Sequence, residues 1–125
     1  MNKTSMTLAC VLGLLGAPAQ AAGENAALKN TPSSKFNAED YALMKARVDQ
    51  ALKAEKDGET LAWNNDKSGA SGTVTALNRL TWNELSCRRL RIVNNHGSTT
   101  GRGVYKFCEK PPGRWKLVGL DGAQQ

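Results

Sequence analysis

The sequence predicts an α+β domain: one N-terminal helix packed on a four- to five-stranded antiparallel meander with a disulfide-linked hairpin. Two observations indicate this fold class. Residues 36–58 place apolar side chains at helical spacing, whereas the residues after Gly58 alternate apolar and polar side chains in short runs between turn formers. Consecutive hairpins form an antiparallel sheet, and the helix that precedes them buries its apolar stripe most completely by packing on one face of that sheet.

The predicted helix has recognisable ends. Asn37 is the expected N-cap, acidic residues follow in the first turn, and Gly58 stands just past the last turn. Phe36 and Tyr41 occupy the two positions of a hydrophobic staple. A stripe of apolar residues at helical spacing is typical of a helix that packs on a core. The stripe consists of Tyr41, Met44, Val48, Ala51 and Leu52.

Five runs with strand periodicity follow the helix, separated by the Asn, Gly, Ser and Pro residues that favour turns. Residues 80–85 are expected to lead into the third strand. Helix and strands form one domain over residues 36–120, and residues 121–125 are expected to be a disordered tail. The expected strands are 59–63, 71–77, 87–93, 102–107 and 115–120.

The first residues have the pattern of a secretory signal peptide. A lysine precedes an apolar run at 7–17, and small residues follow at 17–21. The run is shorter than the roughly 20 residues that a membrane-spanning helix needs. We therefore expect residues 1–21 to be removed on export. A core helix of the domain is the alternative interpretation of this run.

Cys10 raises the possibility of a bacterial lipid anchor, but most of the apolar run follows it rather than precedes it. The mature chain is instead expected to begin at Ala22 or Gly23 without acyl chains. Residues 22–35 are polar and small and are expected to form a flexible leader.

Two cysteines remain in the exported chain, Cys87 and Cys108, and an oxidising compartment favours their pairing. Residues 94–101 between them are rich in turn formers and predict a hairpin centred near Gly97. In a register where paired numbers sum to 195, the two cysteines stand opposite each other, within disulfide reach. Free buried thiols, or a metal or redox site, are the alternative. Because no second His or Cys cluster accompanies them, no metal or cofactor is expected.

The same register separates core residues from cations. Leu90 and Phe107 share one face with Arg88, which is expected to bury its stem there. Like charges opposite each other repel, so the other face needs water or an anion to screen it. That face is a candidate anion-binding surface, although antiparallel sheets also commonly carry a solvated outer face. Its cations are Arg89, Arg91, Arg102 and Lys106.

Charge is concentrated in the strands. Residues 79–116 contain nine Lys or Arg against two acidic residues, while the rest of the mature chain has seven basic and nine acidic residues. A local excess of this kind attracts polyanions. For an exported protein these are phospholipid or lipopolysaccharide head groups, acidic glycans or an acidic protein. Nucleic acid is not expected as a partner.

Several motifs together resemble the C-terminal domain of the bacterial 17-kilodalton surface antigen family. The match covers about residues 38–118, but the glycine-zipper segment of that family has no counterpart at 22–35. The resemblance implies an envelope or outer-membrane-associated protein without established chemistry. The matching residues are Trp63, Asn64, Gly69, Gly72, Cys87, Arg88, Cys108, Gly113 and Trp115.

No enzyme class is indicated by the sequence. The single histidine, His96, is expected in a hairpin turn, and no Ser-His-Asp set can be built around it. Glu84 and Glu109 are expected near each other at the disulfide end of the hairpin, where paired carboxylates could hydrolyse a glycan. Solubilising strand-end charges are the simpler interpretation of these two residues.

Two functions therefore remain open. The first is a structural or surface-interaction protein of the envelope, located in the periplasm, at the outer membrane or outside the cell, with its basic sheet face against anionic components. The second is a soluble binding or inhibitor module that uses this face, or an exposed tryptophan, to bind a protein partner.

Overall fold

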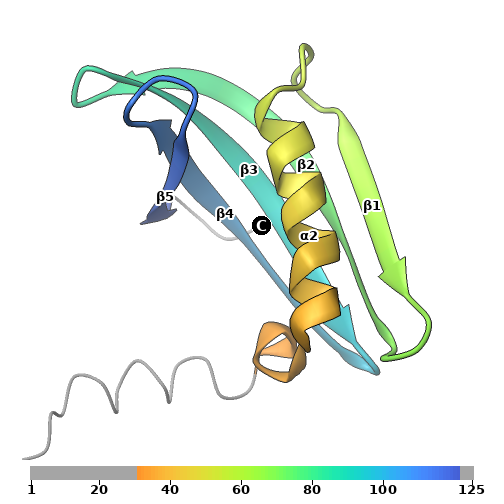
Figure 1. Cartoon of the computed structure of the whole chain (residues 1–125). Helices are drawn as coiled ribbons and strands as arrows, with labels where there is room; N and C mark the ends of the chain where they lie inside the picture. The colour runs from red at the N-terminus through yellow and green to blue at the C-terminus, as the bar shows by residue number, and fades with distance from the viewer. Residues whose placement is uncertain (1–30, 122–125) are drawn as a thin grey trace, which may run out of the picture.

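A computed structural model describes residues 31–121, and it has the predicted α+β architecture (Figure 1). The strands form one antiparallel sheet in the order β1-β2-β3-β4-β5, so each strand pairs with its neighbours in the sequence. The predicted signal peptide and the possible lipid anchor at Cys10 lie outside the described residues. The elements are η1 (Pro32–Lys35), α2 (Ala38–Leu52), β1 (Thr60–Asn65), β2 (Ala70–Trp82), β3 (Leu85–His96), β4 (Thr99–Glu109) and β5 (Trp115–Leu120).

Helix α2 begins as the sequence predicts. The Asn37 side chain accepts a hydrogen bond from the Asp40 amide, and the Asp40 carboxylate accepts one from the Asn37 amide, both at 2.9 Å. This reciprocal capping box satisfies two amides that the helix itself leaves unpaired. The staple also forms, with the Phe36 and Tyr41 rings 5.6 Å apart in edge-to-face geometry.

The helix ends at Leu52, several residues before the predicted end near Gly58. The chain beyond Leu52 is held by the sheet instead, because Arg79 and Arg88 both donate to the Ala54 carbonyl at 2.6 Å. Gly58 then has a φ of 93°, and its amide donates to the Ala76 carbonyl of β2. Propensity alone does not reveal this competition, since the sequence after Leu52 is itself a good helix former.

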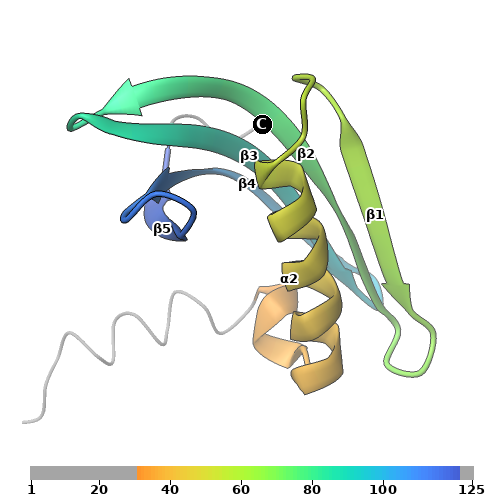
Figure 2. The same ribbon diagram turned by 45° about the horizontal axis from the view of Figure 1, so that its top comes forward.

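The core lies between α2 and the sheet. Figures 1 and 2 show the helix along β1 and β2, with β5 on the other side of the sheet's centre. A second cluster, in which Phe36 packs edge-to-face on Trp63 with ring centroids 5.3 Å apart, closes the N-terminal end of the helix. The main cluster comprises Val48, Ala51, Leu52, Ala54, Val74, Ala76, Leu90, Ile92 and Phe107.

Strands β2 and β3 form a longer hairpin than the sequence predicts. Residues 80–85 were expected only to lead into the third strand, but β2 continues to Trp82 and β3 begins at Leu85. The two-residue turn consists of Asn83 and Glu84, with φ values of 52° and 63°. Positive φ at both positions is the geometry that matches the twist of a two-residue hairpin. A register shift between Ala76 and Arg79 bends β2 on its way to this turn.

The structure describes the last part of the expected leader, residues 31–35. Residues Pro32–Lys35 form the short 3-10 helix η1, which lies against β3 and β4. Pro32 is buried beside Gly101 of β4, where an added Cβ would approach the proline Cδ to 3.0 Å. Because Gly101 has no side chain, Pro32 packs directly on β4 at this position. At the other terminus, Asp121 is also part of the described structure rather than of a disordered tail.

The β3–β4 hairpin has the predicted register, with Cys87 paired to Cys108 and the two sulfurs bonded. The disulfide thus joins the central strand β3 to its neighbour β4 at the end of the hairpin away from its turn. Among residues 31–121, no helix is both long and apolar enough to cross a membrane.

Candidate functional site

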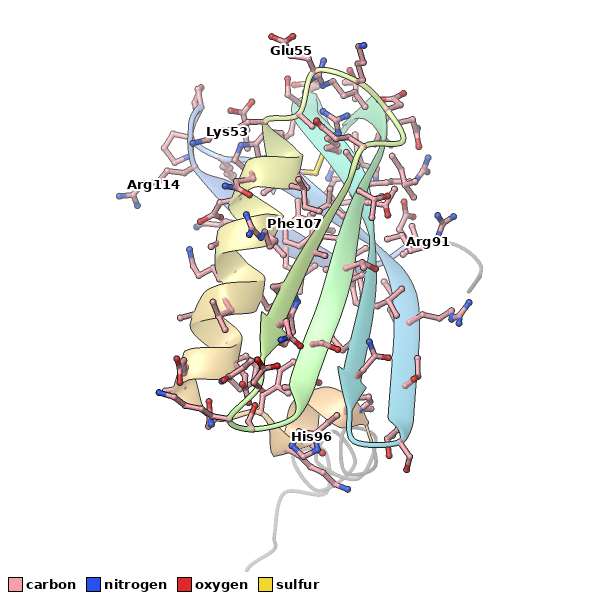
Figure 3. All side chains as sticks on the ribbon, turned by 90° about the vertical axis from the view of Figure 1, so that its right-hand side faces the viewer. Lys53, Glu55, Arg91, His96, Phe107 and Arg114 are labelled. Atoms are coloured by element: carbon pink, nitrogen blue, oxygen red, sulfur yellow. A yellow bond between two sulfur atoms is a disulfide. The ribbon has the colours of Figure 1, made fainter. Side chains whose placement is uncertain are left out.

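The four predicted cations lie on the sheet face opposite α2, which we call the basic face (Arg89, Arg91, Arg102 and Lys106). Arg89 pairs with Lys106 across the strands, while Arg91 and Arg102 stand diagonally opposite each other. Figure 3 shows Arg91 pointing away from the sheet on the side opposite the helix. The structure therefore brings together all four residues that the sequence selected.

Asp121 partly neutralises one end of the basic face. Its carboxylate forms an ion pair with Arg89 and lies 3.8 Å from the Lys106 ammonium. Arg89 also donates to the Asn78 side chain at 3.3 Å, and the Lys106 ammonium lies 4.4 Å from the centre of the Trp82 ring. A cation over an indole face is stabilised by the ring quadrupole. The sequence pattern does not reveal this contact, because Asp121 falls in the predicted tail.

The other end of the basic face lacks such compensation. Within residues 31–121, no acidic side chain lies within ion-pair distance of Arg91 or Arg102. Arg102 is exposed and Arg91 is half-buried. Two neighbouring guanidinium groups without a carboxylate leave their donors available to an external anion.

Arg88 plays a different part from the other arginines. Its guanidinium is fully buried on the helix side of the sheet. It donates to the carbonyls of Leu77 at 3.1 Å and Ala54 at 2.6 Å, and to the Asp57 carboxylate at 3.0 Å. These acceptors belong to β2 and to the segment after α2. Arg88 therefore fastens the end of the helix to the sheet and is unavailable to a ligand.

The surroundings of Arg88 act on its ionisation in opposite directions. Burial lowers the pKa of its guanidinium, and the neighbouring charge of Arg79 lowers it further, while Asp57 and Glu59 raise it. The net direction is downward from the ordinary arginine value. Because an arginine starts so far above neutrality, the group keeps its charge and its hydrogen bonds.

Asp40 forms a second buried polar centre, at the start of α2. Beyond the capping box, its carboxylate accepts hydrogen bonds at 2.7 Å from Asn65 and from Ser68, both at the β1–β2 turn. Burial raises the pKa of the Asp40 carboxyl, but hydrogen bonds from the Asn37 amide, Ser68 and Asn65 outweigh it and lower the pKa below 3.8. Every partner favours the ionised form, so Asp40 acts as an anionic clip between helix and sheet.

Among residues 31–121, the other candidate residues of the sequence are His96 and the pair Glu84 and Glu109, which lie at opposite ends of β3. His96 ends β3, half-buried beside Phe36 with ring centroids 6.5 Å apart. Glu84 and Glu109 line one small cavity, as expected from the hairpin, but the Glu109 carboxylate accepts a hydrogen bond from the Gly113 amide at 2.8 Å. No group of three or more metal-ligating side chains occurs in the described part of the chain.

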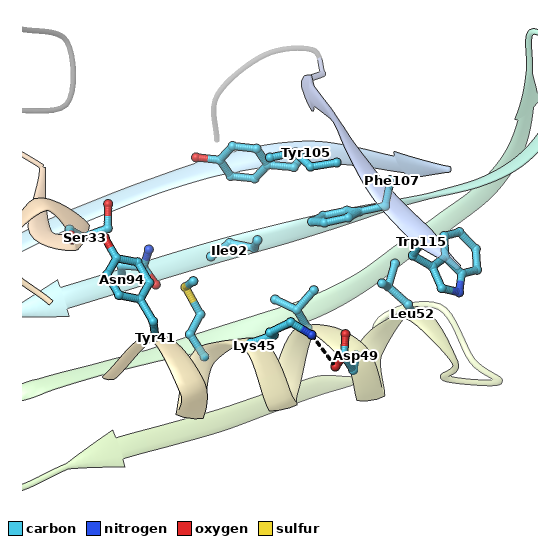
Figure 4. A pocket seen from close by; sticks show the side chains of 13 residues that line it. Ser33, Tyr41, Lys45, Asp49, Leu52, Ile92, Asn94, Tyr105, Phe107 and Trp115 are labelled. Atoms are coloured by element: carbon cyan, nitrogen blue, oxygen red, sulfur yellow. Dashed lines mark hydrogen bonds and ion pairs between the residues drawn. The ribbon is translucent and has the colours of Figure 1, made fainter. Parts of the chain in front are cut away.

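The helix side of the sheet contains an open apolar trough that the sequence pattern does not predict (Figure 4). It exists because α2 lies over β1 and β2 and leaves the inner faces of β4 and β5 uncovered. Its volume is about 440 Å³. The helix contributes Tyr41, Met44, Val48 and Leu52. The sheet contributes Ile92, Tyr105, Phe107, Trp115 and Leu117.

A polar hollow of about 630 Å³ adjoins the trough at the end nearest the disulfide. Leu52 and Trp115 line both spaces and so mark their junction. The polar lining residues of the hollow are two cations, two hydroxyl groups and one acid, Lys53, Arg79, Thr81, Ser86 and Glu109, and Leu80 adds to the apolar lining that Leu52 and Trp115 provide. At the opposite end of the trough, the Asn94 side-chain oxygen is buried and has no hydrogen-bond partner among the described residues.

Comparison of the chain with protein-family models, with curated proteins and with solved structures finds no match.

Proposed function

We propose that this protein is a non-enzymatic, exported envelope protein whose basic face contacts anionic components of the cell envelope. The observation that supports this best is the pair Arg91 and Arg102, which stand diagonally on β3 and β4 without an acidic partner within residues 31–121. Lipid phosphates, lipopolysaccharide and acidic glycans all present anions that two neighbouring guanidinium groups can bind. Exported proteins have little access to nucleic acid, so none is proposed.

Export itself is part of the proposal. The Cys87–Cys108 disulfide fits an oxidising compartment, and the N-terminal pattern of residues 1–21 fits a secretory signal. The small-residue cleavage site favours a form without a lipid anchor, in the periplasm, outside the cell or loosely held at the outer membrane. The resemblance to the surface antigen family agrees with this location, and a relationship to that family is part of the proposal.

A binding or inhibitor module for a protein partner is the second candidate. The observation in its favour is β5, a sheet edge that exposes Leu117, Val118 and Leu120. An exposed apolar edge strand offers both backbone hydrogen bonds and apolar contact to another chain. Cell fractionation separates the two candidates, since a membrane pool released by salt favours the first and a free pool that co-purifies with one protein favours the second.

Vesicle binding tests the first candidate directly. The purified protein is sedimented with phosphatidylcholine vesicles that contain, or lack, phosphatidylglycerol. We expect binding only to the anionic vesicles, weakening with salt because exposed charges are screened beyond about 10 Å at 0.1 M. The double variant Arg91→Gln/Arg102→Gln should lose this binding.

The matched control removes two exposed cations elsewhere, Lys35→Gln/Lys67→Gln, at the η1 helix and the β1–β2 turn. It has the same net charge as the test variant and should still bind. Equal loss in both variants would mean that net charge alone drives adsorption, and persistent binding in the test variant would mean that the basic face is only a solvated surface.

A further inference from the structure

The trough and the polar hollow form one amphipathic site on the sheet face opposite the basic face. Tyr41 and Leu52, at the two ends of the helix wall, are eleven residues apart, which corresponds to roughly 16 Å along a helix. The trough therefore extends roughly 16 Å along the helix. Its volume of about 440 Å³ falls within the usual range of small-molecule sites, about 300–1,000 Å³. A linear apolar chain matches this shape better than a compact ligand does.

Charge is distributed unevenly along the site. The trough lining is apolar except for Ser33 and Asn94 and for Lys45 and Asp49, which neutralise each other at 3.2 Å (Figure 4). The hollow instead contains Lys53 and Arg79, for which no ion pair occurs among residues 31–121. Its one acid, Glu109, is engaged by the Gly113 amide. A ligand that lies along the whole site therefore meets apolar surface at one end and net positive charge at the other.

The hydroxyl groups narrow the choice of anion. Thr81 and Ser86 stand in the hollow with the two cations, and hydroxyl donors suit the several oxygens of a phosphate. The hollow, at about 630 Å³, is also much larger than a carboxylate requires. A phosphate-bearing head group of moderate size uses this room.

We propose that this site binds a single-chain anionic phospholipid, a lysophospholipid, with its acyl chain in the trough and its phosphate in the hollow. The chain runs from the junction at Trp115 and Leu52 along Val48 and Phe107 toward Asn94. This goes beyond the proposed function, because the site lies on the other side of the sheet and shares no residue with the basic face.

The far end of the trough sets the length of chain that fits. Burial of each methylene contributes about 0.8 kcal/mol, so each added methylene should raise affinity roughly fourfold. At Asn94 the wall becomes polar and carries an unpaired side-chain oxygen. The gain should stop when the chain reaches this group, because further methylenes find no apolar partner.

The test follows tryptophan indole N–H signals in a two-dimensional NMR spectrum while lysophosphatidylglycerol is added below its micelle concentration. Trp115 lines the site, whereas Trp63 is buried in the second core cluster and Trp82 lies beside Lys106. Binding should shift the Trp115 signal and leave the other two nearly unchanged. Equal shifts of all three would indicate general detergent action and would overturn the proposal.

Matched variants locate the acyl chain. Leu117 and Leu120 lie on the same strand and are 56% and 64% exposed, but only Leu117 lines the trough. Leu117→Glu should weaken binding more than about tenfold, since it places a charge against an apolar chain. Leu120→Glu, which makes the same charge change, should bind almost as the wild type does. Equal effects of the two substitutions would exclude the trough as the site of the acyl chain. Thermal unfolding checks that both variants are folded.

The head group is tested separately. Lys53→Glu should weaken binding of lysophosphatidylglycerol, while the control Lys67→Glu, at the β1–β2 turn, should not. Dodecanoate and dodecyl maltoside of matched chain length should bind more weakly. Equal affinity for all three amphiphiles would show that the hollow does not hold the head group. Dimers in sedimentation velocity that Leu117→Glu disperses would instead identify a second copy of the chain as the occupant. Loss of vesicle binding by the basic face leaves each of these results unaffected.

Discussion

The buried guanidinium of Arg88 donates a hydrogen bond of 2.6 Å to the carbonyl of Ala54, two residues beyond the end of α2. This contact joins the centre of the sheet to a segment that would otherwise continue as helix. It also explains the run of arginines at 87–93 in physical terms. Neighbouring positions on one strand face opposite sides, so Arg88 is structural while Arg89 and Arg91 belong to the basic face.

Replacing Arg88 by Met should therefore destabilise the domain strongly. The change removes the hydrogen bonds to three backbone carbonyls, of which only Ala54 keeps another donor, Arg79, and leaving a buried acceptor unsatisfied costs about 1–3 kcal/mol. We expect a total loss of about 3 kcal/mol in the free energy of unfolding, measured by urea denaturation. Arg91→Met, on the same strand but the other face, should change stability by about 0.5 kcal/mol or less. Similar effects at both positions would contradict the structural role of Arg88.

Removal of the disulfide is a second prediction. The bond closes a loop with a sequence separation of 21 between Cys87 and Cys108, and such loops stabilise by about 3 kcal/mol in the chain-entropy model. Cys87→Ser/Cys108→Ser should lose a comparable free energy of unfolding. Mass spectrometry after alkylation tests the bond in the exported protein, where two reactive thiols without reductant would contradict it.

The sequence was sufficient to predict the β3–β4 register, and the reason is local. Turn formers around Gly97 fix the centre of the hairpin, and only a register that sums to 195 places the two cysteines opposite each other. The start of α2 was equally accessible because Asn37 and Asp40 form a capping box from neighbouring residues. Residues close together in the sequence therefore determine both the hairpin register and the start of the helix.

Features that depend on distant residues escaped prediction. The end of α2 is decided by Arg79 and Arg88, which follow it by more than twenty residues. The turn at Asn83 and Glu84 lacks the glycine that usually marks a two-residue hairpin. Neither the helix nor any single strand forms the trough by itself. It arises because the helix covers β1 and β2 and leaves the inner faces of β4 and β5 open, and no residue pattern specifies that offset.

The position of Asp121 leads to a third prediction. Its carboxylate occupies both Arg89 and Lys106, so it competes with any external anion for these cations. Asp121→Asn should free them and strengthen binding of the protein to phosphatidylglycerol vesicles, by about threefold to tenfold for the gain of one net positive charge at this face. The control is Asp66→Asn, an exposed carboxylate at the β1–β2 turn that changes net charge equally. Equal gains in both variants would contradict the conclusion that Asp121 competes with external anions at the basic face.

The last prediction concerns acid stability and rests on Asp40. Its pKa is lowered in the folded protein relative to 3.8, the net result of burial that raises it and hydrogen bonds that lower it more. A carboxyl with a lowered folded pKa contributes stability above its unfolded pKa and loses that contribution as pH falls through the folded pKa. Asp40→Asn removes the charge that Asn37, Asn65 and Ser68 stabilise, so it should cost about 2 kcal/mol at pH 7.

Other carboxylates titrate over the same pH range, so the informative quantity is the difference in unfolding free energy between wild type and Asp40→Asn, followed by urea denaturation at each pH. This difference should stay constant from neutral pH to about pH 5 and shrink progressively below pH 4, since the wild type then loses the charge that the variant already lacks. Glu39→Gln, at the exposed neighbouring position in the same helical turn, should show a difference below about 0.5 kcal/mol throughout. A difference for Asp40→Asn that remains unchanged down to pH 2 would mean that the clip acts through shape and hydrogen bonding alone, without its charge.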